Sequence, residues 1–247
     1  MSGHSKWSTI KRKKGAADAK RSKVFSRISK EISIAVKEGG PDPDGNPRLR
    51  LAIANARGVN MPKDNIERAI SSADKDDANL QEVSYEGYAP NGIALFIECM
   101  TDNHNRTISN IRSIFNRRGG SLGISGSVGY MFEIKGVFTV SKAIFNSEEF
   151  QLGVIDAGAE DIEEEGDIYV ITTSLEDYGR VQKKLEDMGI SPDTAELQKI
   201  PKETKKLTSS EAIKILRIIE EFEDLDDVQN VYHNLEITDE VMEAIEE

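Results

Sequence analysis

The charges of this chain are divided unevenly along its length. Residues 1–75 carry 17 basic and 8 acidic side chains, a net charge of +9, whereas the remaining residues carry 15 basic and 36 acidic ones, a net charge of -21. A division of this kind favours separate folding units with separate roles over one uniform domain. The length of 247 residues leaves room for one to three domains.

The excess of basic over acidic residues is concentrated in the first thirty residues. Ten lysines and arginines stand there against one acid, Asp18, and the only tryptophan of the chain, Trp7, lies among them. Polyanions attract such a segment because each neutralised phosphate releases a condensed counterion, and an indole ring can stack on an unpaired base. We therefore predict a nucleic-acid-binding arm, with an ordinary solvated terminus as the alternative. The candidate binding residues are Lys6, Trp7, Lys11, Arg12, Lys13, Lys14, Lys20, Arg21, Lys23 and Arg27.

Three stretches of the first 75 residues have apolar residues at helical spacing. The pattern predicts helices from 17 to 37, from Pro47 to a break at Gly58, and from Pro62 through Ala73. The third helix has a face of mixed charge, with Asp64 and Glu67 beside basic residues. A plain three-helix bundle is therefore favoured over a helix-turn-helix that reads bases.

The rest of the chain alternates between strand and helix patterns. Two strands at 82–88 and 93–100, joined by a hairpin turn, precede a helix at 107–118. From 135 to 206 the order is strand, helix, strand, strand, helix, strand, which is the split pattern of ferredoxin-like folds. A later helix at 209–222 and a strand at 228–237 would complete the earlier unit.

The sequence therefore predicts an α+β fold of three domains. Residues 1–75 form a basic three-helix domain, and two ferredoxin-like-type α/β domains follow it. Residues 76–134 plus 207–247 form the second domain, and residues 135–206 form a third that is inserted in it. The helix at 107–118 presents four arginines on its outer face, which could contact phosphate or simply face solvent: Arg106, Arg112, Arg117 and Arg118.

No group of residues in the sequence predicts an enzyme, a metal site or a cofactor. The glycine-rich run from Gly119 to Ser127 lacks the lysine of a phosphate-binding loop, and a strand at 128–132 is expected after it instead of a helix. The histidines do not stand at metal-ligand spacing. Acidic runs at 160–167 and 220–227 match no calcium loop, which predicts a solvated surface.

One dense polar cluster, at residues 102–106, leaves a hydrolase as a weaker alternative. Asparagine and aspartate also cap helices, so a helix start explains the cluster without chemistry. The lone Cys99 cannot form an internal disulfide, which fits a reducing compartment. No run is long and apolar enough for a membrane span or a secretory signal, so we expect a cytoplasmic protein with no membrane partner.

Several motifs resemble those of the YebC/PmpR family. They are the opening Gly3-His4-Ser5-Lys6-Trp7 and the runs 58–70, 85–90 and 119–132, so that the resemblance covers nearly the whole chain. It implies a three-domain cytosolic regulator of transcription that binds DNA and has no defined catalytic residues. It also implies an alternative, because a mitochondrial relative activates translation and bacterial relatives are linked to translation through proline runs. The alternative partner is then messenger or ribosomal RNA, or the ribosome itself.

Overall fold

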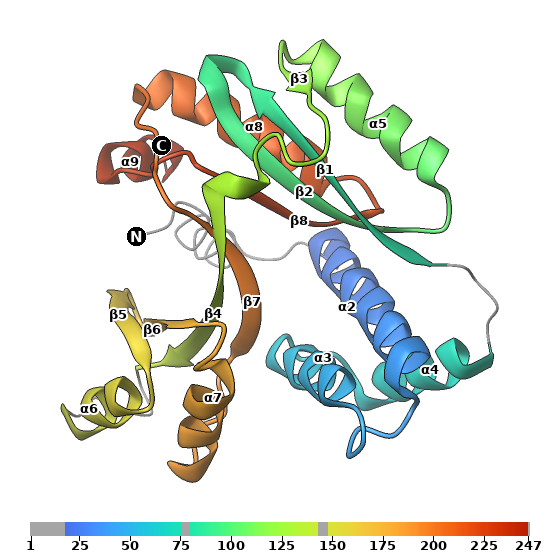
Figure 1. Ribbon diagram of the computed structural model, residues 1–247, viewed down its shortest axis with the longest axis vertical. Helices are drawn as coiled ribbons and strands as arrows, with labels where there is room; N and C mark the ends of the chain where they lie inside the picture. The colour runs from blue at the N-terminus through green and yellow to red at the C-terminus, as the bar shows by residue number, and fades with distance from the viewer. Residues whose placement is uncertain (1–17, 76–79, 143–147, 247) are drawn as a thin grey trace. The chain divides into compact units, whose positions relative to one another are not determined.

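The computed structural model describes residues 18–75, 80–142 and 148–246 (Figure 1). Within these residues the chain divides into two compact units. Unit 1 consists of residues 80–133 and 200–246, and unit 2 consists of residues 18–75 and 134–199. None of the helices in these ranges is long and apolar enough to cross a membrane.

Unit 1 is an antiparallel sheet with helices against one face. Its strands lie in the order β3-β1-β2-β8, with bounds β1 (Gln81–Ala89), β2 (Ile93–Thr101), β3 (Ser121–Leu122) and β8 (Val228–His233). Helices α5 (His104–Arg117) and α8 (Ser209–Glu223) cover the sheet, and α9 (Asp239–Glu246) follows near the C-terminus. The rings of Phe115 and Phe222, from α5 and α8, lie 4.8 Å apart in the core between them.

Strand β2 is buried on both faces, which explains the apolar run from Ile93 to Ile97. Leu95, Ile97 and Cys99 point into the helix-covered core. Ala94 and Phe96 alternate with them and meet a second cluster on the opposite face, formed with Val128, Phe132 and Tyr232. The segment 128–132 therefore covers the side of the sheet that the helices leave open.

The inserted part of unit 2 has the split ferredoxin-like arrangement. Its strands lie in the order β5-β6-β4-β7, with β4 (Phe132–Ser141), β5 (Ala159–Glu165), β6 (Ile168–Ser174) and β7 (Thr194–Pro201). Helices α6 (Glu148–Asp156) and α7 (Tyr178–Asp187) supply Phe150, Val181 and Leu185 to a core shared with Phe138 and Tyr169 of the sheet.

The helical part of unit 2 contains α2 (Asp18–Gly39), α3 (Pro47–Gly58) and α4 (Lys63–Lys75). Pro47 occupies the first turn of α3, where its missing N–H costs nothing. The Asn46 side chain caps α3 by accepting a hydrogen bond from the Leu49 amide at 3.0 Å. Its amide nitrogen also donates to the Ala35 carbonyl at 2.7 Å, so one buried side chain joins the first two helices.

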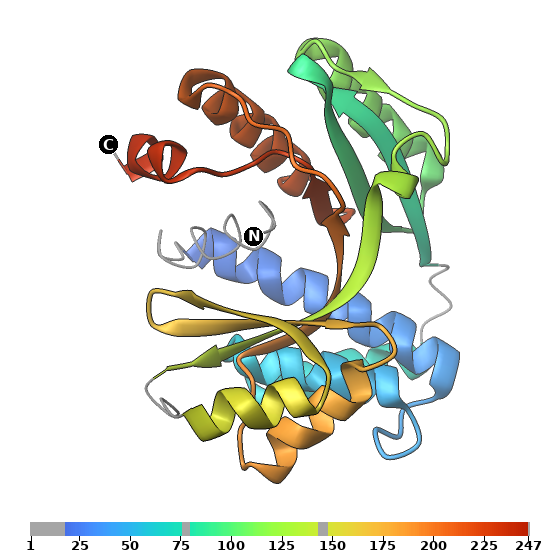
Figure 2. The same ribbon diagram turned by 60° about the vertical axis from the view of Figure 1, so that its left-hand side comes forward.

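Helix α3 also packs against the inserted domain (Figure 2). The Ala195 amide donates to the Asn55 side-chain oxygen at 3.2 Å, and Leu51 packs on the core beneath β4 and β6. At Gly58 the backbones approach so closely that a Cβ atom would lie 2.0 Å from the Asp193 carbonyl oxygen. The helical and inserted parts therefore form one compact unit.

The predicted fold class is confirmed, and two local expectations are wrong. The segment 128–132 is not a strand: Gly129–Met131 form a short 3-10 turn, η2, and strand β4 begins at Phe132. The amides of Val128 and Gly129 donate to a carboxylate, so they are unavailable to a neighbouring strand. Helix α5 begins at His104, three residues before the expected start, because Asn103 caps it. Helix α9 was not predicted.

Candidate nucleic-acid interface

Six of the ten predicted binding residues lie outside the described residues: Lys6, Trp7, Lys11, Arg12, Lys13 and Lys14. The other four, Lys20, Arg21, Lys23 and Arg27, are all on the first half of α2. Arg21 is exposed, whereas Lys23 and Arg27 are half-buried. The structure thus places four of the candidates on one helix, which follows the other six in the chain.

The arginines of α5 were the other candidates for phosphate contact, and three of the four are paired with carboxylates of the chain itself. Arg106 contacts both Asp102 (2.7 Å) and Asp227 (2.9 Å) through its Nη2 atom. Arg117 Nη2 lies 3.1 Å from a Glu221 oxygen, and Arg118 binds the other oxygen of the same carboxylate. Phosphate would have to displace these internal partners.

The ion pairs also fix the charge of their members. The hydrogen bond from Arg118 is the main reason that the pKa of Glu221 lies below its ordinary value; burial opposes the shift and Arg117 adds to it. The hydrogen bond to Asp227 is the main reason that the pKa of Arg106 is raised. Glu221 therefore stays ionised and Arg106 stays protonated, and each faces a partner of opposite charge.

The expectation that the acidic run 220–227 is a solvated surface is wrong in part. Glu223 and Asp227 are each only 8 % exposed, and Glu221 is committed to the two arginines. The Thr107 hydroxyl donates to Asp227 Oδ2 at 2.9 Å, so this carboxylate contacts the first turn of α5. In the other run, Glu160 and Glu164 pair with Lys135 and Lys142. Among the residues that the structure describes, no group of His, Cys, Asp or Glu is arranged to hold a metal ion.

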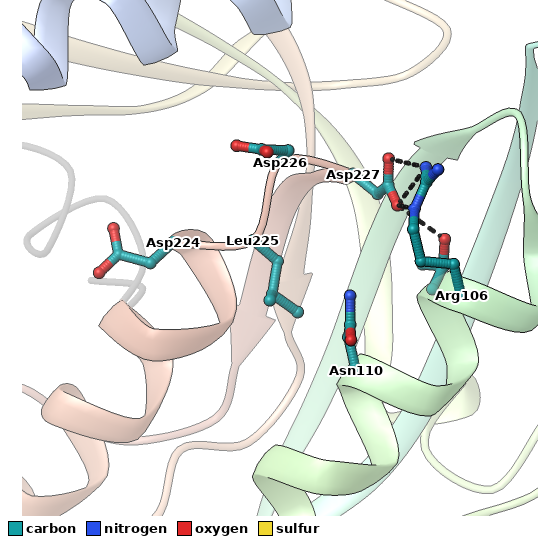
Figure 3. A pocket seen from close by; sticks show the side chains of 7 residues that line it. Arg106, Asn110, Asp224, Leu225, Asp226 and Asp227 are labelled. Atoms are coloured by element: carbon teal, nitrogen blue, oxygen red, sulfur yellow. Dashed lines mark hydrogen bonds and ion pairs between the residues drawn. The ribbon is translucent and has the colours of Figure 1, made fainter.

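The polar cluster at 102–106 borders a hollow of about 450 Å³ between α5 and the α8–β8 connection (Figure 3). The hollow is lined by Arg106, Asn110, Asp224, Leu225, Asp226 and Asp227. Asn103 caps α5 by accepting the Arg106 amide at 3.0 Å. The hydrogen bond from Arg106 holds the pKa of the exposed Asp102 carboxyl below its usual range. Capping and ion pairing thus account for the cluster, and a carboxylate held in its ionised form is poorly suited to act as a general acid.

The glycine-rich loop holds an anion, but the anion belongs to the chain. Glu86 of β1 is 6 % exposed, and its carboxylate accepts hydrogen bonds from the amides of Gly126 (2.7 Å), Val128 (2.6 Å) and Gly129 (2.8 Å). Successive backbone N–H groups of this kind form an anion-binding concavity. Because Glu86 fills it, no phosphate can occupy the same amides.

Sequence reasoning rejected a nucleotide loop here but missed the role of Glu86. Burial alone would raise the pKa of the Glu86 carboxyl, yet the three backbone hydrogen bonds outweigh burial and the pKa is lowered. The available signal was the alternation of β1, which places Glu86 on the same face as Tyr88, a position that is covered in the fold.

Comparison with known proteins gives one consistent result. Residues 5–76 match the family described as the TACO1/YebC protein N-terminal domain, and residues 80–235 match the TACO1/YebC second and third domain. A relative from Rubrobacter xylanophilus is 48% identical over 248 residues, which cover 99% of both chains. One from Geotalea uraniireducens is 49% identical and covers 99% of this chain and 100% of its own. Both carry the name "Probable transcriptional regulatory protein".

A solved structure is also similar. The crystal structure of a conserved hypothetical protein from Aquifex aeolicus is 40% identical in sequence, covers 91% of this chain and 94% of its own, and superposes with a TM-score of 0.83. Both the sequence and the fold therefore lead to the same conclusion, and the chain belongs to the TACO1/YebC family.

Proposed function

We propose that the protein is a non-enzymatic regulator of gene expression that binds DNA through its basic N-terminal segment. The charge distribution carries this proposal: ten basic residues stand against one acid in the first thirty, whereas the arginines of α5 are largely neutralised by the chain's own acids. Phosphate contact then falls to the arm and the start of α2. The names of the relatives, which call them transcriptional regulatory proteins, support a role in transcription.

Binding by such a segment is mainly electrostatic. Phosphate contacts position a protein on a nucleic acid but carry no sequence information. The acidic remainder of the chain, with its net charge of -21, repels polyanions and restrains indiscriminate binding. A specific target must therefore supply contacts beyond the arm.

A second candidate function is a translation factor that binds RNA or the ribosome and assists elongation through proline runs. Trp7 is the observation that favours it, because it is a single indole ring placed among cations. Aromatic rings stack readily on unpaired bases, which RNA loops offer and a DNA duplex does not. The arm itself suits either function.

The test is a binding titration of the full chain at two salt concentrations, against a DNA duplex and an RNA hairpin with an unpaired loop. The test variant replaces Lys11, Arg12, Lys13 and Lys14 with Ala. The control variant removes the same number of lysines and arginines from exposed positions elsewhere: Arg180, Lys183, Lys214 and Arg217. We expect the arm variant to lose at least about tenfold in affinity near 0.1 M salt, and its log–log salt slope to fall by about three to four units on the duplex.

The control variant should lose much less affinity than the arm variant, because its altered residues lie away from the arm. Equal losses in the two variants would contradict binding by the arm, and binding that does not respond to salt would contradict phosphate contact altogether. The choice between candidates rests on the unaltered chain: tighter binding to the duplex supports the transcriptional role, and tighter binding to the RNA loop supports the translational one.

A further inference from the structure

The glycine-rich loop between β3 and β4 presents two apolar side chains to solvent. Ile124 is 82 % exposed and Tyr130 is 68 % exposed. Tyr130 is the one aromatic residue with a largely exposed ring among the residues that the structure describes. A single exposed apolar residue needs no explanation, but these two come from one loop whose backbone is unusually well held.

Several independent contacts hold the loop. Its amides at 126, 128 and 129 grip the Glu86 carboxylate, and the Ser127 amide closes a turn onto the Ile124 carbonyl at 3.1 Å. Phe132 packs edge-on against Phe96, with ring centroids 6.3 Å apart. The exposed residues of the loop are therefore held in place by buried contacts of the same loop.

The Tyr130 side chain stands on this well-held backbone. The Tyr88 hydroxyl donates to the Ser127 carbonyl at 3.1 Å; burial raises the pKa of Tyr88, and the nearby Tyr130 adds to the shift. Tyr130 therefore lies close to Tyr88 while 68 % of its own surface remains exposed. A ring carried on a backbone that is ordered in advance costs little conformational entropy when a partner binds.

A short lysine-rich segment adjoins the backbone of the loop. The Lys202 amide donates to the carbonyl of Met131 at 2.9 Å, so the backbone of this lysine pairs with the residue after Tyr130. Lys202, Lys205 and Lys206 are all exposed and lie in one short segment that contains a single acid, Glu203. An exposed aromatic ring on a loop that adjoins such a segment has the chemistry of a single-strand binding surface, in which a base stacks and the backbone phosphate meets a cation.

We propose that Tyr130 is a stacking platform for an unpaired base of the bound nucleic acid, with Lys202 contacting a neighbouring phosphate. This inference rests on the proposed function and adds to it a second contact, remote in sequence from the basic arm. It also gives the protein a means to distinguish unpaired from paired nucleic acid, because bases within a duplex already stack on one another.

The experiment uses the full chain with a labelled 12-nucleotide single-stranded RNA and the corresponding duplex. Tyr130→Ala should weaken single-strand binding by about 5- to 150-fold, the range for loss of one stacked base, and should leave duplex binding unchanged. Tyr130→Phe keeps the ring and should bind within about twofold of the unaltered chain. Leu152→Ala, which removes an apolar side chain that is 61 % exposed on α6, is the control and should have no effect. Lys202→Ala should reduce the single-strand salt slope by about 0.7.

The outcomes separate this inference from the proposed function. If the unaltered chain binds neither nucleic acid, both fail. If the arm variant loses binding but Tyr130→Ala binds single strands normally, only the stacking platform is wrong. An equal loss on the duplex, or a Phe variant as weak as the Ala variant, would also overturn it, since neither result fits stacking by the ring.

Discussion

Glu86 keeps only 6 % of its surface exposed and yet remains ionised. Three backbone N–H groups replace the water that burial removes, and hydrogen bonds to a charged acceptor are stronger than those between neutral groups. The side chain therefore ties the glycine-rich loop to β1 at its centre. This carboxylate is one of the contacts that hold the loop in the shape that leaves Ile124 and Tyr130 exposed.

Replacing Glu86 with Gln should destabilise unit 1 by about 1.5–3 kcal/mol at pH 7, because a charged acceptor is lost and an amide NH₂ is turned toward backbone N–H donors. The pKa of Glu86 is lower in the folded chain than its ordinary 4.5. Its stabilising effect is therefore complete above that value and is lost as the pH falls through the lower folded pKa. Urea unfolding at pH 7 and at successively lower pH should show the difference in stability between the two proteins shrinking as Glu86 becomes protonated. Glu203→Gln, at an exposed position, should change stability little; a constant gap at both pH values would contradict the role given to the charge.

Helix α5 is held at both ends by acids from a distant part of the sequence. At its start, Arg106 and Thr107 bind Asp227, and at its end Arg117 and Arg118 bind Glu221. Long helices gain most of their stability from packing, and here the ion pairs also fix how α5 lies beside the α8–β8 connection. The arginines that make this helix look basic in the sequence are thus mostly paired with acids of the same chain.

The two acids on Arg106 should differ in importance because they differ in exposure. The Asp227 side chain is 10 % exposed, and that of Asp102 is 58 % exposed. Asp227→Ala removes the covered carboxylate that Arg106 and Thr107 share. Arg106 keeps only the exposed Asp102, and Thr107 keeps Thr101 and Asn103, so the change should cost about 1–3 kcal/mol of unfolding free energy. Asp102→Ala removes a solvent-screened partner of the same arginine and should have no measurable effect. The midpoints of urea unfolding of the two variants provide the comparison, and equal losses would show that the buried contact has no special weight.

At the scale of the whole molecule, the helical segment and the inserted domain share one unit through the contact of α3 with β7. Gly58 permits this contact, since any Cβ there would meet the Asp193 carbonyl. The basic start of α2 therefore belongs to a unit that contains the inserted domain as well as the three helices.

Gly58→Ala should destabilise unit 2 even though alanine is the better helix former, because the steric conflict with Asp193 outweighs a propensity gain of about 1 kcal/mol. Gly179→Ala is the matched control: Gly179 lies in α7, and a Cβ there has nothing within 4 Å. We expect the control to raise the melting temperature and Gly58→Ala to lower it. A rise in both would mean that the α3–β7 contact can relax at little cost.

Periodicity alone predicted most of the elements, because α3, β2 and the strands of the inserted domain each bury a regular apolar pattern. Three features escaped it for physical reasons. The binding of Glu86 by three backbone amides depends on the direction of the N–H groups, which side-chain patterns do not encode. The pairing of Arg106 with Asp227 joins residues far apart in the chain, and the close approach at Gly58 appears only after α3 meets β7.

The position of β8 has a consequence for the order in which the protein can be made. Strand β2 ends at Thr101, but the strand that pairs with its outer edge begins at Val228, and the inserted domain is synthesised in between. While a ribosome synthesises that stretch, the outer edge of the apolar strand β2 has unpaired backbone N–H and C=O groups. Such edges promote association with other chains. The inserted domain can fold during this interval because its four strands follow one another in the chain. The sheet of unit 1, in contrast, must wait for β8, which begins at Val228. We therefore expect unit 1 to complete its fold late and slowly, after most of the chain has been synthesised.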